Sequence, residues 1–478
     1  MVEFNILSES DKKLIHSEAL RILSEAGVHL PSPPILAMLK EKGCEVDESA
    51  GLVKFPAALV EEALKTAPKQ FILGGLDSKN DMRLGEGNTY VATDGQSCFV
   101  YDSEKGERRE TVMQDLVDAA RLVDQLDYIR CFWPIVSASD APVGARTLFE
   151  AAQTYRVLGK HFQTDCFSAP QAKYYIRMLE AILGSREKVI ERKILSFVCC
   201  PMSPLSYEAE MMEGCLAMGE VEAPIVILPM PISGTTAPMS LLATVIQNNA
   251  EVLAGLTVFQ LGRPGMPIIY GAAPGILDMV STLFCTGSAE GALQNAACCE
   301  MAKHYKLPCL ISSNCSEAKE PDIQAGREKA ASATTAYLSR PDILCGAGLV
   351  DTANLFYPEL LILDADSIGY AKRIATGING GAEHALTDVA VKIGPGGTFL
   401  SEKSTRQYLR SGEHYHPLCT QRQSYETWLE MPNRSIRDIA KAKAADMLTV
   451  PEKTYLSEAV MGKLQEILAE AEKEFCVE

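Results

Sequence analysis

The sequence predicts an α/β protein with the architecture of a (β/α)8 barrel, preceded by an N-terminal helical extension and followed by a C-terminal helical cap. Short β-branched and apolar runs alternate with longer helical stretches, which is typical of repeated βα units and a parallel sheet. About eight such runs recur at intervals of roughly 30 to 40 residues, as in a (β/α)8 barrel. The length of 478 residues accommodates such a barrel with extensions. A doubly wound open sheet has the same alternation and is the competing interpretation.

Residues 1–80 are predicted to form the N-terminal helical extension. Leu14, Ile22 and Ala26 belong to an apolar pattern that recurs every three or four residues, and Pro33 and Gly43 punctuate it. Residues 358–478 are predicted to be a C-terminal helical region that packs on the barrel. There, residues 358–391 look helical, a glycine-rich turn occupies 394–397, and a charged helix covers 452–474.

The barrel itself is predicted for residues 81–357. The expected strands are 89–93, 129–136, 161–166, 194–200, 225–230, 267–271, 308–312 and 343–347. Helices expected between them include 113–126, 145–158, 171–183 and 239–256.

Composition excludes several classes of function. The chain has 45 Lys and Arg against 62 Asp and Glu, a formal charge of −17, which repels phosphate backbones. Strongly apolar runs such as 223–231 are shorter than the roughly 18 to 20 residues of a membrane helix, and the acidic start lacks the features of a signal peptide. We therefore expect a cytoplasmic protein that binds neither nucleic acid nor membranes.

The cysteines and histidines do not form a recognisable metal site. The 15 cysteines lie mostly in apolar runs without a C-x-x-C pair, so buried free thiols are expected. His414, His416 and Cys419 have the chemistry of zinc ligands, but they lie in a polar loop where solvated side chains are the better interpretation. The sequence also lacks a phosphate-binding loop, a G-x-S-x-G turn and an H-E-x-x-H motif. No bound metal is predicted.

The residues that follow each strand converge on one face of a barrel, where its chemistry takes place. Here the main carboxylates are Asp94, Asp165 and Asp351, and no histidine follows any strand. The reaction therefore need not involve proton transfer. The alternative is that Pro, Gly and Ser build tight turns in these loops and that the aspartates cap helices.

Several aromatic residues lie near the same loops. Rings around a pocket would hold a quaternary ammonium by cation–π attraction, and the alternative is that they pack in the core or the wall. The residues are Phe99, Tyr101, Phe132, Trp133, Phe167, Tyr270, Phe356 and Tyr357.

Several motifs between about residues 15 and 430 jointly resemble the trimethylamine methyltransferase family. They include Thr93-Asp94-Gly95-Gln96, Gly234-Thr235-Thr236-Ala237-Pro238, Pro321-Asp322-Ile323-Gln324-Ala325-Gly326 and Gly394-Pro395-Gly396-Gly397. The resemblance implies a TIM barrel that demethylates an amine and hands the methyl group to the cobalt of a separate corrinoid protein. It implies no tightly bound cofactor, because the partner protein supplies the corrinoid.

The founding trimethylamine enzymes of that family carry pyrrolysine in the barrel, whereas this chain has only standard residues, including the stretch 312–321 after the seventh predicted strand. The departure places the chain with the pyrrolysine-lacking branch, which is known for glycine betaine, proline betaine and carnitine. A quaternary nitrogen already carries a good leaving group, a neutral tertiary amine, so attack on its methyl carbon requires no acid or base.

The resemblance and the loop positions together suggest roles for individual residues. A cage of rings is expected from Phe99, Tyr101, Trp133, Phe356 and Tyr357, and charge balance from Asp94 or Asp351. Donors to a betaine carboxylate would be Gln96, Asn314, His384 or Arg373, although Arg373 also fits a helix-surface charge.

Two other functions remain open from the sequence. A non-catalytic betaine-binding protein could use the same cage without a corrinoid partner. A barrel lyase or aldolase acting on a small anion would need a Lys at a strand end or a metal cluster, and neither is evident. Association of several copies of the chain is compatible with the sequence but is not specified by it.

Overall fold

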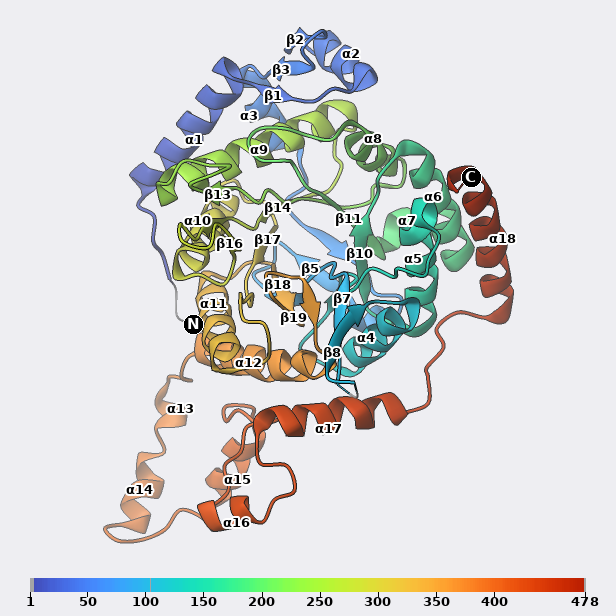
Figure 1. Cartoon of the computed structure of the whole chain (residues 1–478). Helices are drawn as coiled ribbons and strands as arrows, with labels where there is room; N and C mark the ends of the chain where they lie inside the picture. Colours follow the sequence, from blue (N-terminus) through green and yellow to red (C-terminus); the bar gives the residue numbers. More distant parts are fainter. Residues whose placement is uncertain (1–3, 104, 477–478) are drawn as a thin grey trace.

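A computed structural model describes residues 4–103 and 105–476. Eight parallel strands close into a barrel in the order β10-β11-β12-β14-β17-β18-β6-β9 (Figure 1). The strands are β6 Tyr90–Thr93, β9 Cys131–Phe132, β10 His161–Asp165, β11 Leu195–Cys199, β12 Ile225–Ile227, β14 Ile268–Ala272, β17 Cys309–Ser312 and β18 Ile343–Ala347. Each lies within or beside its predicted range. The barrel prediction is therefore confirmed, and closure excludes the open sheet.

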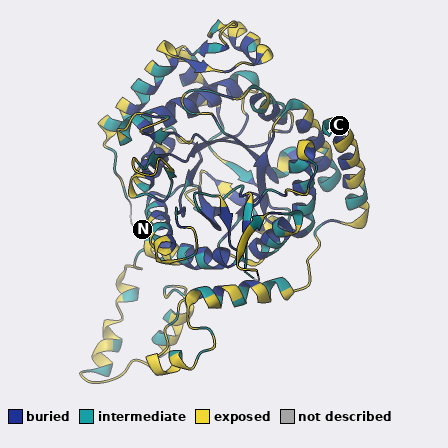
Figure 2. Cartoon of the chain, in the orientation of Figure 1, coloured by how far each residue is buried: buried dark blue, intermediate teal, exposed yellow. Residues whose placement is uncertain are grey.

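Alternation along the strands explains why they are apolar throughout. Val198, Val226 and Ile269 face the barrel interior, whereas Phe197 and Ile227 belong to the larger cluster between strands and helices. Because both faces of each strand are covered, neither face needs polar residues. Figure 2 shows the strands as the buried centre of the molecule.

The outer ring of helices follows the strands around the barrel. Its members are α4 Met113–Gln125, α5 Arg146–Val157, α6 Ala169–Leu183, α8 Ala209–Met218, α9 Leu241–Gly262, α10 Ala289–His304, α11 Ile323–Ser339 and α12 Pro358–Thr376. Side chains at their first turns fix several starts: Ser168 caps α6, Ser288 caps α10 and Asp322 caps α11. The short helix α7 Arg186–Arg192 follows α6.

Helix α9 is long and apolar enough, by length and composition, to cross a membrane. However, 78% of its most apolar window is buried inside the protein. It packs against α1, α3 and α10, so its hydrophobicity is accounted for by core packing.

The N-terminal extension contains a small sheet that the sequence analysis did not predict. Helices α1 Glu9–Glu25, α2 Pro33–Glu41 and α3 Ala57–Thr66 were expected in outline. Between them, β1 Val28–His29, β2 Glu45–Asp47 and β3 Leu52–Lys54 form a three-stranded antiparallel sheet in the order β1-β3-β2. These strands have two or three residues each, too short for an alternating pattern to be recognised.

Three further small sheets cover the ends of the barrel. The hairpin β4 Phe71–Leu73 and β5 Met82–Leu84 packs into the interior cluster from the amino ends of the strands. On the opposite side, loops after the strands form a four-stranded sheet, β19-β20-β7-β8, and a three-stranded sheet, β13-β15-β16. Their strands are β7 Phe99–Asp102, β8 Glu107–Glu110, β13 Ile232–Ser233, β15 Gly275–Leu277, β16 Phe284–Cys285, β19 Leu349–Val350 and β20 Leu355–Phe356.

The C-terminal region is helical, as expected, but it lies along the outer wall instead of across the barrel. Helix α17 Ile436–Thr449 packs on α12 and α4, and α18 Glu458–Phe475 packs on α6 and α5. Between α12 and α17, a segment that we call the arm, residues 377–434, extends away from the barrel (Figure 1). Its helices are α13 Ala382–Ala385, α14 Thr387–Ile393, α15 Lys403–Arg410 and α16 Tyr425–Leu429, and none of them contains a buried residue.

Candidate active site at the barrel mouth

Three neighbouring strands bring an indole and two carboxyl groups together at the barrel mouth, the face formed by the carboxyl ends of the strands. Asp94 directly follows β6, Trp133 directly follows β9, and Asp165 is the last residue of β10. In the barrel β9 pairs with β6 on one side and with β10 on the other. The indole therefore belongs to the strand between the two strands that carry the carboxyl groups.

Asp165 is a buried acid with one firm partner. The Nε2 of Gln96 donates a hydrogen bond of 2.6 Å to its Oδ2. Burial raises the pKa of Asp165 to about 7, and the polar groups of Gln96 and Trp133 oppose that rise. Within the described chain this carboxyl has no ion-pair partner, so its charge near neutral pH is available to a bound cation.

Asp94 lies in a similar environment on the other side of Trp133. Burial raises its pKa to about 6, whereas the more distant charge of Lys329 lowers it. The backbone N–H of Gly95 donates to Oδ1 at 3.1 Å, and the thiol of Cys315 lies 4.0 Å from Oδ2. The residue itself is half-buried, so solvent and small molecules reach it from the mouth.

The ring of Trp133 is held in place by close packing. Its side chain is 9% exposed, and its backbone oxygen accepts a 2.6 Å hydrogen bond from Thr93. A Cβ placed on Gly95 would come within 2.7 Å of the ring, so only glycine leaves space there. Nε1 is buried and completes no hydrogen bond of good geometry among the described residues.

A buried ion pair supports the mouth from behind. Lys329 Nζ lies 3.0 Å from Asp364 Oδ2 and donates to the backbone oxygen of Asn314 at 2.6 Å. Asp364 in turn accepts from the backbone N–H of Gly348 at 2.7 Å. The pair ties the ends of β17 and β18 to helices α11 and α12. Since Lys329 faces Asp94 only at a distance, it biases that acid toward ionisation without neutralising it.

The structure places the three predicted polar residues Gln96, Asn314 and Asp351 in three different environments. Gln96 lies at the mouth, in contact with Asp165. Asn314 is fully buried behind the wall, with its backbone N–H donating to Ser332 at 3.0 Å. Asp351 pairs with Lys319 in the turn between β19 and β20, so a neighbouring side chain already balances its charge. Of these three, only Gln96 is positioned to contact a molecule in the mouth.

The five rings expected to form one cage are dispersed. Tyr101 and Tyr357 stack on each other with ring centroids 4.8 Å apart, and the guanidinium of Arg437 lies 5.3 Å from the Tyr357 ring. Arg108 covers the ring of Phe99 at 4.1 Å. Phe356 is buried in the core, 2% exposed. Only Trp133 belongs to the cluster inside the barrel, because the other four lie on or beside the four-stranded sheet above it.

Arg373 and His384 lie far from the mouth. Arg373 is in the last turn of α12, where its guanidinium donates to the backbone oxygens of Glu413 and Gly377. His384 is in the arm and contacts the hydroxyl of Tyr408 at 2.8 Å. The structure does not bring these residues to the barrel mouth: helix α12 carries Arg373 back toward the amino ends of the strands, and the arm that follows carries His384.

A cavity of about 390 Å³ opens beside Asp165 and Gln96. Its walls come from the loops after β9 and β10, the first turns of α5 and α6, and the end of α18. The lining residues are Gln96, Ser137, Val143, Gly144, Arg146, Thr147, Phe167, Ser168, Gln171, Glu210 and Phe475. Sequence reasoning noted Phe167 but missed Arg146, which follows an irregular loop that places it by tertiary folding alone.

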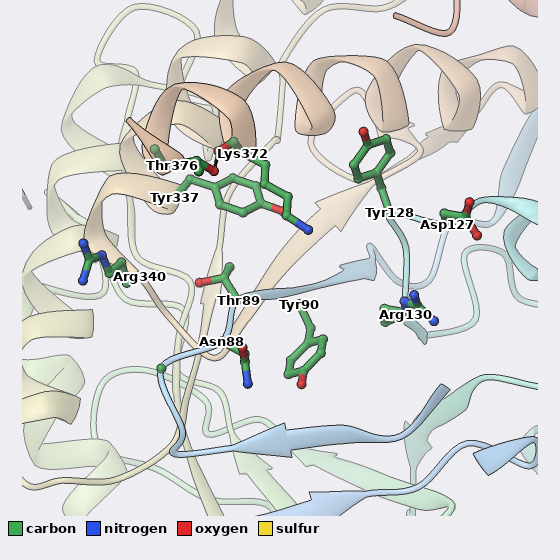
Figure 3. Close-up of a pocket in the computed structure, with 12 residues that line it drawn as sticks. Asn88, Thr89, Tyr90, Asp127, Tyr128, Arg130, Tyr337, Arg340, Lys372 and Thr376 are labelled. Atoms are coloured by element: carbon green, nitrogen blue, oxygen red, sulfur yellow. Dashed lines mark hydrogen bonds between the residues drawn. The ribbon is translucent and has the colours of Figure 1, made fainter. Parts of the chain in front are cut away.

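A second cavity, of about 300 Å³, lies at the opposite end of the barrel (Figure 3). It is formed by the residues before β6 and β9 and by the last turns of α11 and α12, including Thr89, Tyr128, Arg130 and Lys372. Arg130 donates to Asn80 Oδ1 at 2.9 Å. The amino ends of barrel strands serve stability, whereas reactions take place at the mouth, so we assign the chemistry to the mouth.

Within residues 4–103 and 105–476, no group of three or more His, Cys, Asp and Glu side chains has an arrangement that could hold a metal ion. Cys419 is buried, and His416 contacts the backbone oxygen of Leu409 at 3.3 Å. All 15 cysteines are free thiols, and 11 of them are buried.

Comparison with known proteins identifies the family to which the chain belongs. The family model described as "Trimethylamine methyltransferase (MTTB)" matches residues 1–476. The chain belongs to the trimethylamine methyltransferase family. It is therefore a methyltransferase, as the motifs around Asp94 and in residues 321–326 indicated.

Individual relatives span the whole chain. Trimethylamine methyltransferase MttB of Methanosarcina barkeri is 30% identical over 479 residues, covering 99% of this chain and 96% of its own. Glycine betaine methyltransferase of Desulfitobacterium hafniense is 28% identical over 474 residues, covering 99% and 98%. The family thus includes proteins named for a tertiary and for a quaternary amine.

A solved structure shares the fold. The crystal structure of the monomethylamine methyltransferase MtmB of Methanosarcina barkeri superposes with a TM-score of 0.51 at 13% sequence identity, covering 93% of this chain and 89% of the other. At this identity the likeness establishes the barrel and no more.

Proposed function

We propose that this protein demethylates a quaternary amine, glycine betaine or a related betaine such as proline betaine or carnitine, and transfers the methyl group to Co(I) of a cognate corrinoid protein. The methyl acceptor is a second substrate, and this chain keeps no cofactor of its own. We further propose that the protein acts in the cytoplasm, where a reducing environment suits its free thiols.

One observation carries the proposal: a buried carboxyl group, Asp165, and a half-buried one, Asp94, flank an indole at the mouth without a direct cationic partner. Asp94 and Asp165 have pKa values raised by burial, so each ionised form lacks the stabilisation that water would give. A permanent cation supplies that stabilisation. A quaternary ammonium cannot donate hydrogen bonds, and the face of Trp133 together with two carboxylates is the surface that such a group prefers.

The chemistry fits the groups that are present. Methyl transfer from a quaternary nitrogen breaks the N–CH3 bond, and the bonding electrons stay on nitrogen, so a neutral tertiary amine leaves. No proton moves in this step. The protein needs only to bind the cation, aim one methyl group outward and exclude water, tasks that Trp133, Asp94 and Asp165 can perform without a general base. The standard residues at 312–321 agree with a substrate that needs no further activation.

The rim of the mouth supports docking of a partner protein. Large apolar side chains are exposed on successive loops after the strands, which is unusual unless another surface covers them. They are Phe167, Met202, Met230, Met239 and Met279, with exposed fractions from 41% to 66%. Flexible methionines adapt to a partner's contour and are common at binding surfaces.

The decisive experiment mixes the protein with a reduced corrinoid protein and a candidate methyl donor. Glycine betaine, proline betaine, carnitine, choline and trimethylamine are tested separately, and the Co(I) absorbance is followed. With a betaine, the Co(I) band is expected to give way to that of methyl-Co(III); trimethylamine is expected to leave it unchanged.

The same assay separates the alternatives. Tight binding of a betaine without methyl transfer to any corrinoid protein would indicate a binding protein. Turnover of a small anion in the absence of corrinoid would indicate a lyase or aldolase. Methyl transfer from trimethylamine alone would contradict the proposed substrate class.

A further inference from the structure

The cavity beside Asp165 contains a guanidinium without a matching anion. Arg146 is the first residue of α5 and lines this cavity of about 390 Å³. Its Nε is buried with no hydrogen-bond partner, and its Nη1 has only a long contact of 3.4 Å to Ser137 Oγ. No carboxylate within the described residues forms an ion pair with it.

The charge of Arg146 acts on Glu150 and opposes the rise in its pKa, but the two side chains form no ion pair among the described residues. Glu150, one turn further along α5, is buried and accepts a 2.8 Å hydrogen bond from the backbone N–H of Ala138, while its other oxygen has no partner. Burial raises the pKa of Glu150 to about 7. Glu210, the acid that lines the cavity, is exposed to solvent at the edge.

The position of Arg146 is locally unfavourable. A cation in the first turn of a helix meets the positive end of the helix dipole, where acidic residues are preferred. Helix packing therefore does not explain an arginine here. An anion bound in the cavity would be attracted both by the guanidinium and by the first turn of α5.

The far side of the cavity suits a cation. Gln96 lines it and holds Asp165, the carboxyl group next to Trp133. The ring of Phe167, 44% exposed, lines the same space. The cavity thus has a guanidinium and an aromatic ring in its lining, and one lining side chain, Gln96, connects it to the carboxyl group of Asp165 behind the wall.

We propose that Arg146 is the specificity-determining residue that binds the carboxylate of a zwitterionic quaternary amine, while the ammonium group lies toward Asp165 and Trp133. This inference rests on the proposed function and names the residue that would distinguish betaines from quaternary amines without a carboxylate, such as choline. A planar guanidinium can bind both oxygens of a carboxylate, which a lysine in the same place cannot do equally well.

The test compares a betaine with its counterpart that lacks the carboxylate. Binding of glycine betaine and of choline is measured by titration calorimetry, without a corrinoid protein, for the wild type, Arg146→Gln, Arg146→Lys and a control, Arg186→Gln, which changes an exposed arginine on α7. Arg146→Gln is expected to weaken betaine binding roughly 10- to 100-fold and choline binding less than about threefold. Arg146→Lys should fall between Arg146→Gln and wild type, and the control should match wild type.

The outcomes separate the carboxylate site from the proposed function. Betaine affinity unchanged in Arg146→Gln would overturn the carboxylate site and leave the proposed function intact. Equal losses for betaine and choline would also overturn it, because the substitution would then act on the whole pocket. A wild type that binds none of glycine betaine, proline betaine and carnitine, and transfers no methyl group from any of them, would overturn the proposed function itself.

Discussion

Trp133 lies on the strand between those that carry the half-buried Asp94 and the buried Asp165, so its ring faces any cation that both acids attract. Replacement by Ala should raise the KM for the quaternary amine roughly tenfold, because one good cation–π contact contributes about 0.5 to 2 kcal/mol. Replacement by Phe, which keeps a ring, should have a smaller effect. Steady-state kinetics with the corrinoid protein in excess would measure both.

Phe356→Ala is the matched comparison for Trp133→Ala, because both rings were predicted to belong to the cage. Its side chain is buried in the core, so Phe356→Ala should lower the free energy of unfolding by about 3 to 5 kcal/mol. The KM of the folded fraction should stay close to wild type. A tenfold higher KM in Phe356→Ala with wild-type stability would show that the ring faces the substrate instead.

The pKa of Asp165 predicts how substrate binding depends on pH. Its folded-state pKa of about 7 lies above the ordinary value of 3.8 because of burial. A cation binds the ionised form, so affinity for a quaternary amine should increase roughly thirtyfold between pH 5.5 and pH 8. Calorimetric titrations across this range would measure the change, and flat affinity would contradict it.

Ionised Asp165 should lower the free energy of unfolding in the same pH range in which it strengthens amine binding. Since its pKa is raised on folding, its stabilising contribution is complete below about pH 4 and is lost as the pH rises through 7. Asp165→Asn should therefore increase the free energy of unfolding at pH 8 by an amount on the order of 2 kcal/mol, while it weakens amine binding. The exposed Asp446→Asn is a suitable control for denaturant unfolding.

At the scale of elements, Lys160 joins β10 to the end of helix α4. Its buried ammonium group donates to the backbone oxygens of Val123, Leu126 and Ile129 at 2.6, 2.6 and 2.7 Å. Burial lowers its pKa to about 7. One side chain thus binds three backbone oxygens at and just beyond the end of the helix, and those of Val123 and Leu126 also accept the backbone N–H groups of Leu126 and Ile129.

Removing the Lys160 side chain should destabilise the contact between the start of β10 and the end of α4. Lys160→Met removes three hydrogen bonds from an ammonium group to backbone oxygens, two of which keep a backbone donor, and we expect the free energy of unfolding to fall by about 3 kcal/mol. Lys173→Met, on the exposed face of α6, should be nearly neutral. Denaturant titration of both variants gives the comparison, and equal stabilities would contradict the role of Lys160.

For the whole molecule, the four helices of the arm are its least buried part, whereas residues 415–420 are tied to α12 through Asp366. Ile378, Val391 and Leu400 are 76% to 90% exposed, and the arm's helices bury no residue. Apolar side chains in this density indicate contact with another surface. We expect copies of the chain to associate through the arm.

Light scattering after size exclusion should therefore give a mass that is a multiple of 51.9 kDa. The double substitution Ile378→Glu and Leu400→Glu should reduce it, because charges in a desolvated contact oppose association. The exposed substitution Val143→Glu, at the barrel mouth, should not. A wild-type mass of one chain would contradict the expectation.

The sequence by itself determined the eight strands, most of their helices and the acids at the strand ends. Asp94 and Asp165 were found because an apolar run shows where a strand stops, and the next side chains of a parallel barrel must reach its mouth. Family motifs added the class of reaction, since they mark positions that many barrels do not share.

Only the tertiary structure decided which side chains meet. Phe99, Tyr101, Phe356 and Tyr357 follow barrel strands as Trp133 does, yet a small sheet above the barrel turns them toward one another and toward the core. Arg146 reaches the cavity from the first turn of α5, whose position follows from the irregular loop before it. A local pattern encodes where a strand begins and ends, but the direction of a loop side chain depends on packing between segments far apart in the chain, which no local pattern records.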